Sequence, residues 1–141
     1  MARIKLSVPE KSHFSTSIRL RISDINYGGH LGNDAVLSIA HEARMQFLAH
    51  YGWKELDVEG AGLIQSDTGI VYKSEGYYAD EVQIDISIYD MHRCGFDMFY
   101  LMKNLSTGKV LAHVKTGMIT YDYHNAKVMP LPESFRQKFS D

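Results

Sequence analysis

Apolar and polar residues alternate along residues 14–23, which read FSTSIRLRIS. One side of an extended chain would carry Phe14, Thr16, Ile18, Leu20 and Ile22. The other side would carry only serine and arginine side chains. Because successive side chains of a strand point to opposite faces of a sheet, this alternation predicts a half-buried strand.

The spacing changes to a helical period over residues 34–52, DAVLSIAHEARMQFLAHYG. Apolar residues recur every three or four positions, and they are Val36, Ala40, Ala43, Phe47 and Tyr51, with Leu37 and Leu48 widening the stripe. Asn33 or Asp34 can cap the start of this helix, and Gly52 can close its end. The stripe is too apolar to face water, so the pattern predicts one long helix packed against a sheet.

Four further strands are predicted after the helix. They are residues 63–77, 81–89, 96–103 and 109–123. The first is irregular and broken near Gly69 or Gly76, whereas residues 81–89 alternate cleanly. Ser106, Thr107 and Gly108 form a plausible hairpin loop, and residues 131–139 are predicted to end in a short helix that starts near Glu133 and Ser134. This order predicts an α+β fold, in which one antiparallel sheet carries one helix on its face.

The strand at residues 96–103 is apolar on both faces. Its alternating apolar residues are Met98, Phe99, Tyr100, Leu101 and Met102. One helix covers only one face of a sheet, so we predict that a second subunit covers part of the other face and that the protein is a homodimer or homotetramer. The alternative is a central strand with an ordinary amphipathic exterior.

Composition narrows the class of protein. The chain has 141 residues, of which 45% are hydrophobic, and this length fits one domain spanning residues 1–141. The formal net charge is -2, and no basic stripe suggests nucleic acid as a partner. The single cysteine, Cys94, excludes an intramolecular disulfide and suits a reducing compartment. Without a signal-peptide pattern or a window of about 20 apolar residues, we expect a cytoplasmic protein and no membrane partner.

Polar residues and glycines concentrate between the first strand and the long helix, in residues 23–34 (SDINYGGHLGND). Gly28, Gly29 and Gly32 allow the backbone to approach a ligand closely. The first turn of the helix leaves backbone N–H groups without intrahelical partners, and the helix dipole favours negative charge there. These N–H groups could therefore stabilise the oxyanion that forms when a carbonyl compound is attacked.

Asp24, Asn26 and His30 lie in the same junction and supply a base or orienting groups for such a hydrolysis. Glycine, asparagine and aspartate are also the commonest residues of loops before helices, so a purely structural role stays open. The stretch GGHLGN has neither the GxGxxG spacing nor the lysine of a phosphate-binding loop, which argues against nucleotide binding. His41 and Glu42 are not followed by the second histidine of a HExxH zinc site.

The segment RISDINYGGHLGNDAVLSIAHEARMQFL resembles the signature of the hotdog-fold acyl-CoA thioesterases, the group related to 4-hydroxybenzoyl-CoA thioesterase. Their pattern is roughly D-x-D-x-x-G-H-x-x-N, followed by a long helix with glutamate, alanine and arginine. The matching positions are Asp24, Asn26, Gly29, His30, Asn33, Glu42, Ala43 and Arg44. The family's order of elements is followed over residues 14–139.

This resemblance implies a sheet wrapped around the central helix and dimers whose two sheets join into one, often paired into tetramers. It also implies active sites at the dimer interface, near the N-terminus of the central helix. Neither a metal nor a bound cofactor is implied, because coenzyme A is part of the substrate. Substrate would be bound near Gly29, Leu31, Gly32 and Asn33.

Asn26 departs from the family pattern, because many relatives carry a catalytic carboxylate at this position. An amide cannot accept a proton, but it can hold a water molecule or donate to the thioester oxygen. His30 is then the candidate base, with Asp24 orienting it, since imidazole titrates near neutral pH. Glu42 is the alternative base, reaching a site across the interface. In the alternatives without a catalytic role, His30 is a loop histidine bonded to the backbone and Glu42 is a solvated residue paired with a neighbour.

Three functions remain open on these residues. The first is hydrolysis of acyl-CoA thioesters, and the second is a non-catalytic module that binds acyl thioesters in the same groove. The third, hydration of enoyl thioesters, fits the loop pattern least. Lys73, Lys103 and Lys115 are candidates to meet the phosphates of coenzyme A, although lone lysines on strands usually face solvent. The methionines Met91, Met98, Met102 and Met118 suit either an acyl channel or core packing.

Overall fold

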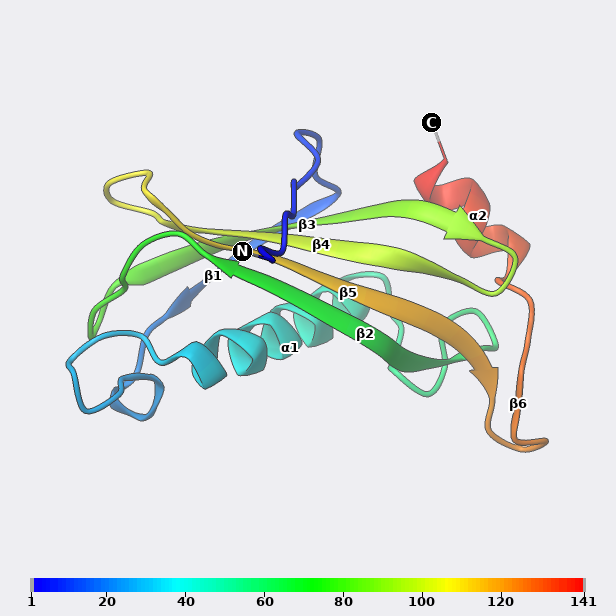
Figure 1. Cartoon of the computed structure of the whole chain (residues 1–141). Coiled ribbons are helices and arrows are strands. Elements are labelled where there is room, and N and C mark those ends of the chain that lie inside the picture. Colours follow the sequence, from blue (N-terminus) through cyan, green and yellow to red (C-terminus); the bar gives the residue numbers. More distant parts are fainter. Residues whose placement is uncertain (1, 141) are drawn as a thin grey trace.

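The computed structural model of the chain describes residues 2–140. Five strands form one antiparallel sheet in the order β1-β3-β4-β5-β2, and a short β6 pairs with β5. The strands are β1 (Phe14–Arg19), β2 (Gly62–Tyr72), β3 (Glu81–His92), β4 (Gly95–Asn104), β5 (Val110–Asp122) and β6 (Lys127–Val128). The helix α1 (Asn33–His50) lies along one face of the sheet, and α2 (Glu133–Phe139) packs at one end (Figure 1). The predicted arrangement of one antiparallel sheet against one long helix is confirmed.

The core lies between α1 and the inner face of the sheet. On β3, Val82, Ile84, Ile86 and Ile88 are buried, as the alternation of residues 81–89 predicted. The buried residues of α1 are Val36, Ile39, Ala40, Ala43, Arg44, Phe47 and Leu48. The expected widening of the stripe by Leu37 is wrong, because this side chain is 38% exposed and Ile39 occupies the interface instead.

The ends of α1 differ in how they are capped. Gly52 takes φ +77° just after the helix, so the predicted glycine stop is confirmed. At the start, Gly32 is the N-cap residue and no side chain caps the helix, so the expectation of a cap from Asn33 or Asp34 is wrong. No side-chain hydrogen bond therefore caps the first turn.

Two strand boundaries differ from the sequence pattern. The first strand ends at Arg19, because Ile22–Asp24 form a turn of 3-10 helix. At its start the Asp24 carboxylate accepts a hydrogen bond from the backbone N–H of Arg21. The strand β2 runs through Gly69 without a break, and its irregularity lies between Gln65 and Asp67. Gly76 lies beyond the end of β2. Within residues 2–140, no helix is long and apolar enough to cross a lipid bilayer.

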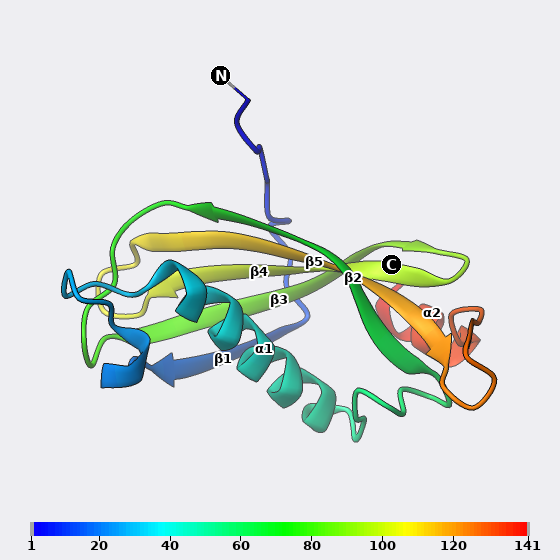
Figure 2. The same ribbon diagram turned by 60° about the horizontal axis from the view of Figure 1, so that its bottom comes forward.

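The N-terminal segment crosses the face of the sheet opposite α1 (Figure 2). The carbonyl of Leu6 accepts a hydrogen bond from the His113 ring (3.0 Å), and the carbonyl of Lys11 accepts one from the Tyr89 hydroxyl (3.2 Å). Phe99, on the same outer face, is only 8% exposed within one chain. Part of the apolar outer face of β4 is therefore already buried within one subunit, and the homo-oligomer stays a prediction.

An aromatic cluster fills the space at the C-terminal end of α1. Phe135 of α2 lies 4.5 Å from Phe96 and 5.4 Å from Trp53, measured between ring centroids. Phe139 of α2 lies 5.8 Å from Phe47 of α1 by the same measure. The short C-terminal helix, predicted near Glu133 and Ser134, is confirmed, and it anchors this end of the sheet.

Candidate active site

A cavity of about 310 Å³ opens at the N-terminal end of α1. Four of the predicted site residues line it, namely Asn26, His30, Leu31 and Asn33. Its other walls come from α1, from the end of β2 and the residues after it, and from β5; they are Val36, Tyr72, Lys73, Ser74, Glu75 and Leu111. The fold thus brings the junction of residues 23–34 against a segment much later in the chain.

The side chain of Asn26 organises the loop before α1. Its Oδ1 accepts hydrogen bonds from the backbone N–H groups of Gly28 (2.9 Å) and His30 (3.3 Å). Because two N–H donors point at Oδ1, the orientation of the amide is fixed by the loop itself. Gly29, at φ +84°, completes the turn. The amino group Nδ2 is then left as a donor beside the cavity, with no acceptor within residues 2–140.

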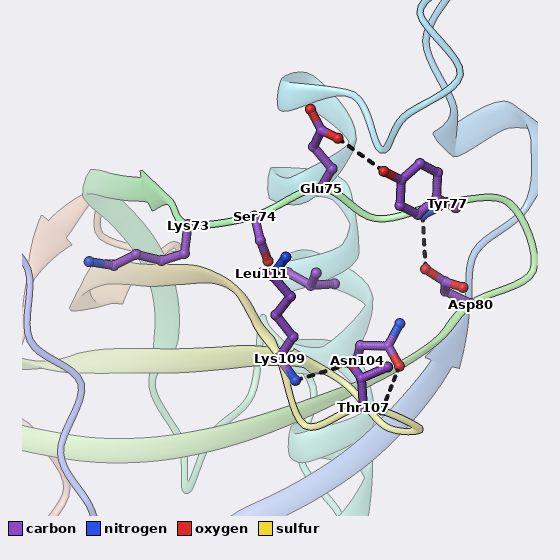
Figure 3. A pocket seen from close by; sticks show the side chains of 9 residues that line it. All are labelled: Lys73, Ser74, Glu75, Tyr77, Asp80, Asn104, Thr107, Lys109 and Leu111. Atoms are coloured by element: carbon purple, nitrogen blue, oxygen red, sulfur yellow. Dashed lines mark hydrogen bonds between the residues drawn. The ribbon is translucent and has the colours of Figure 1, made fainter.

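His30 is held by a carboxylate that the sequence did not indicate. Its Nε2 lies 3.2 Å from a carboxylate oxygen of Glu75, and its ring meets the Tyr77 ring edge-on at 5.4 Å. The Tyr77 hydroxyl donates to the same Glu75 oxygen at 3.0 Å (Figure 3), and this hydrogen bond raises the pKa of Tyr77. The His30 side chain is 38% exposed, so solvent reaches the pair. His30 and Glu75 together form a solvent-exposed pair at the edge of the cavity.

The backbone donors at the start of α1 are only partly available. The N–H of Leu31 donates to the carbonyl of Gly76 (2.7 Å), and the N–H of Gly32 donates to the carbonyl of Asp24 (2.9 Å). The N–H groups of Asn33 and Asp34 donate to no acceptor in the described part of the chain. Of these two residues only Asn33 lines the cavity, so the helix end offers its amide hydrogen there, and the helix dipole adds to the positive potential.

Asp24 and Glu42 line a different groove, of about 600 Å³, between β1 and α1. Asp24 is 5% exposed, and its carboxylate accepts a hydrogen bond from the backbone N–H of Arg21 at 2.8 Å. The carboxylate of Glu42 accepts a hydrogen bond from the Gln46 amide at 2.9 Å. Neither carboxylate contacts His30, whose carboxylate partner is Glu75. An orienting role for Asp24 and a catalytic role for Glu42 stay predictions.

The three candidate lysines differ in their ion pairs and in whether they line the cavity. Lys103 lies 3.8 Å from an Asp85 oxygen, and Lys115 lies 2.7 Å from Asp67 and 3.6 Å from Asp97. Lys73 alone of the three lines the cavity, and it forms no ion pair with any described residue. Met98, Met102 and Met118 are buried in the core. No three His, Cys, Asp or Glu side chains among residues 2–140 come together as a metal site would need.

A twisted antiparallel sheet on one central helix, with a polar cavity where that helix begins, defines the hotdog class of thioesterase folds. Residues 20–139 match the sequence profile of the thioesterase-like superfamily, and the chain belongs to this family. No curated protein matches the chain significantly by sequence.

Solved structures confirm the fold. The 1,4-dihydroxy-2-naphthoyl-CoA thioesterase Slr0204 from Synechocystis matches with a TM-score of 0.80 and 18% identity, over 91% of this chain and 96% of that one. The gentisyl-coenzyme A thioesterase BH1999 matches with a TM-score of 0.78 and 20% identity, over 90% of this chain and 100% of that one. A thioesterase-superfamily protein from Jannaschia sp. CCS1 matches with a TM-score of 0.82 and 17% identity, over 93% of this chain and 83% of that one.

Proposed function

We propose that the chain hydrolyses acyl-CoA thioesters to a free acid and coenzyme A in the cavity at the start of α1. The observation that carries this proposal is the meeting of His30, Asn26 and the first residue of α1, Asn33, around one cavity. Membership of the thioesterase-like superfamily supports the class of reaction. Two structural relatives are described as coenzyme A thioesterases, which supports the class of substrate.

We propose a role in the reaction for each of these groups. The thioester oxygen lies toward Asn26 Nδ2 and the N–H group of Asn33. His30 removes a proton from the attacking water, and Glu75 stabilises the imidazolium that results. The donors stabilise the tetrahedral oxyanion. When the carbon–sulfur bond breaks, His30 returns the proton to the leaving thiolate, which leaves a carboxylic acid, coenzyme A and the free enzyme.

A module that binds acyl thioesters without hydrolysing them is the second candidate, and Asn26 is the observation that favours it. The amide occupies the position where many relatives carry a catalytic carboxylate, and it cannot accept a proton. In this alternative the donors around the cavity would hold the carbonyl of a bound thioester, and His30 with Glu75 would serve only to shape the loop.

A panel of acyl-CoA substrates with a thiol reagent separates the two candidates. We expect thiol release that saturates with substrate and that depends on His30. Saturable binding by calorimetry without thiol release, across short, long and aromatic acyl groups, would leave only the binding module. A mock preparation purified from cells without the gene controls for contaminating thioesterases.

We propose further that the active protein is a homodimer or a pair of dimers, with the site bordered by a second subunit. The support is the edge strand β2, whose residues 65–68 are exposed and whose outer edge has no partner strand among residues 2–140. Long exposed edge strands are normally paired or protected. We expect light scattering to give at least twice the mass of one chain at assay concentration. A fully active monomer would contradict this proposal.

A further inference from the structure

A second cavity, of about 580 Å³, lies beside the first (Figure 3). The two cavities share Lys73, Ser74, Glu75 and Leu111 as lining residues. The second cavity extends from this shared wall to the turn between β4 and β5, where Asn104, Thr107 and Lys109 line it. A ligand long enough to cross the shared wall could therefore occupy both cavities at once.

Most side-chain acceptors around the second cavity already have a hydrogen-bond partner within the protein. Asn104 Oδ1 accepts the N–H groups of Ser106 (2.9 Å) and Thr107 (3.1 Å). The hydroxyl of Thr107 accepts the N–H of Lys109 (3.2 Å). Each of the two carboxylates of the lining has one bonded oxygen: Asp80 Oδ2 accepts the N–H of Tyr77 at 2.9 Å, and Glu75 Oε2 accepts the hydroxyl of Tyr77 and lies close to His30.

The unused groups are donors. Neither Lys73 nor Lys109 forms an ion pair or a side-chain hydrogen bond with any of residues 2–140, and the Asn104 amino group has no acceptor there either. Figure 3 shows the Lys109 side chain extending from the turn toward Ser74, across the cavity. Two ammonium groups without an ion pair and an amide donor suit an anion rich in oxygen acceptors.

We propose that the second cavity binds the phosphate groups of the coenzyme A part of the substrate, with Lys73 and Lys109 as the binding residues. This inference rests on the proposed function, because the shared wall places the phosphates and the reacting thioester in one extended molecule. Sequence alone gave no reason to prefer Lys73 over Lys103 and Lys115, and it did not indicate Lys109. The structure separates these lysines by whether a carboxylate already neutralises them.

The test compares Lys73→Ala, Lys109→Ala and the double variant on four thioesters of one acyl group. The thioesters are acyl-CoA, acyl-3′-dephospho-CoA, acyl-phosphopantetheine and acyl-pantetheine. Each lysine variant should raise KM for acyl-CoA by roughly tenfold, the scale of one hydrogen bond to a charged group. The ratio of variant to wild type should fall toward one for acyl-pantetheine, which has no phosphate. The effect should weaken as salt is added.

The matched control is Lys103→Ala, which removes the same charge next to the same turn from a lysine that Asp85 already holds. Calorimetry with free coenzyme A separates this inference from the proposed hydrolysis, since it needs no turnover. Lysine-dependent binding of coenzyme A by a protein that hydrolyses none of the acyl-CoA thioesters would support the phosphate site and refute the proposed hydrolysis. Equal affinity in all variants, or no binding of coenzyme A by the wild type, would overturn the phosphate site. If the lysine variants raise KM for acyl-phosphopantetheine as much as for acyl-CoA, the lysines bind the phosphate next to the pantetheine. Thioesters of carrier proteins carry this phosphate as well.

Discussion

Replacing His30 with alanine is expected to lower kcat for acyl-CoA hydrolysis by roughly 10²-fold or more, the usual scale of general-base catalysis. His30 is the only imidazole lining the cavity at the start of α1 within residues 2–140. Its Nε2 is held 3.2 Å from Glu75, which leaves the ring in a fixed place beside the free amide donors. Steady-state kinetics with acyl-CoA measures the change, and a thermal melt verifies that the variant is folded.

The matched control is His41→Ala. His41 also pairs with a glutamate, Glu55 at 2.9 Å, but it lies on the groove between β1 and α1. We expect its kcat to stay within a few-fold of wild type. Added imidazole should partly restore the His30 variant, and Glu75→Gln should lose less than the alanine variant, because the base itself remains. Near wild-type turnover by His30→Ala would remove His30 from the mechanism.

Converting Asn26 to aspartate is the second change with a large expected effect, and its sign is informative. Aspartate has nearly the same shape, and its carboxylate can still accept the N–H groups of Gly28 and His30 that fix the loop. The substitution removes the amino group that faces the cavity and places negative charge where the oxyanion forms. We expect kcat to fall by roughly 10²-fold, as when one oxyanion donor is lost.

A rise in kcat for Asn26→Asp would contradict this mechanism. It would show that the position needs a carboxylate as base or nucleophile, and that the natural amide is a weakened or disabled form of the site. Gln137→Glu makes the same charge change on the exposed side of α2 and controls for the added negative charge. Measuring KM alongside kcat separates weaker binding of the anionic substrate from a slower chemical step.

Local patterns were sufficient where one element packs on one face. The alternation of residues 81–89 located the buried side of β3, and the helical period of residues 34–52 located α1. The end of the first strand was missed because the Asp24 carboxylate caps a 3-10 turn, which competes with the extended pattern. Leu37 was misplaced because a helical stripe gives the direction of burial without its edges.

The candidate site was only half accessible from the sequence. Asn26, His30 and Asn33 are close along the chain, so their meeting at the start of α1 could be expected from the loop and the resemblance. Glu75 joins them, and Lys109 lies at the neighbouring cavity, only because β2 and β5 pair in the sheet and carry their ends to the same place. Nothing in the local sequence around Glu75 marks it as the partner of His30, since that contact depends on long-range pairing.

The aromatic cluster at the C-terminal end of α1 closes the interior between the helix and the sheet at that end. Phe47, Phe96 and Phe135 are at most 1% exposed, and packing of this kind leaves little room for a guest. An acyl group entering beside His30 would therefore meet a blind end instead of a tunnel running the length of the helix. Tolerance for bulky or extended acyl groups would then be decided at the mouth of the cavity, and engineering of chain length should begin there, leaving the rings of α2 intact.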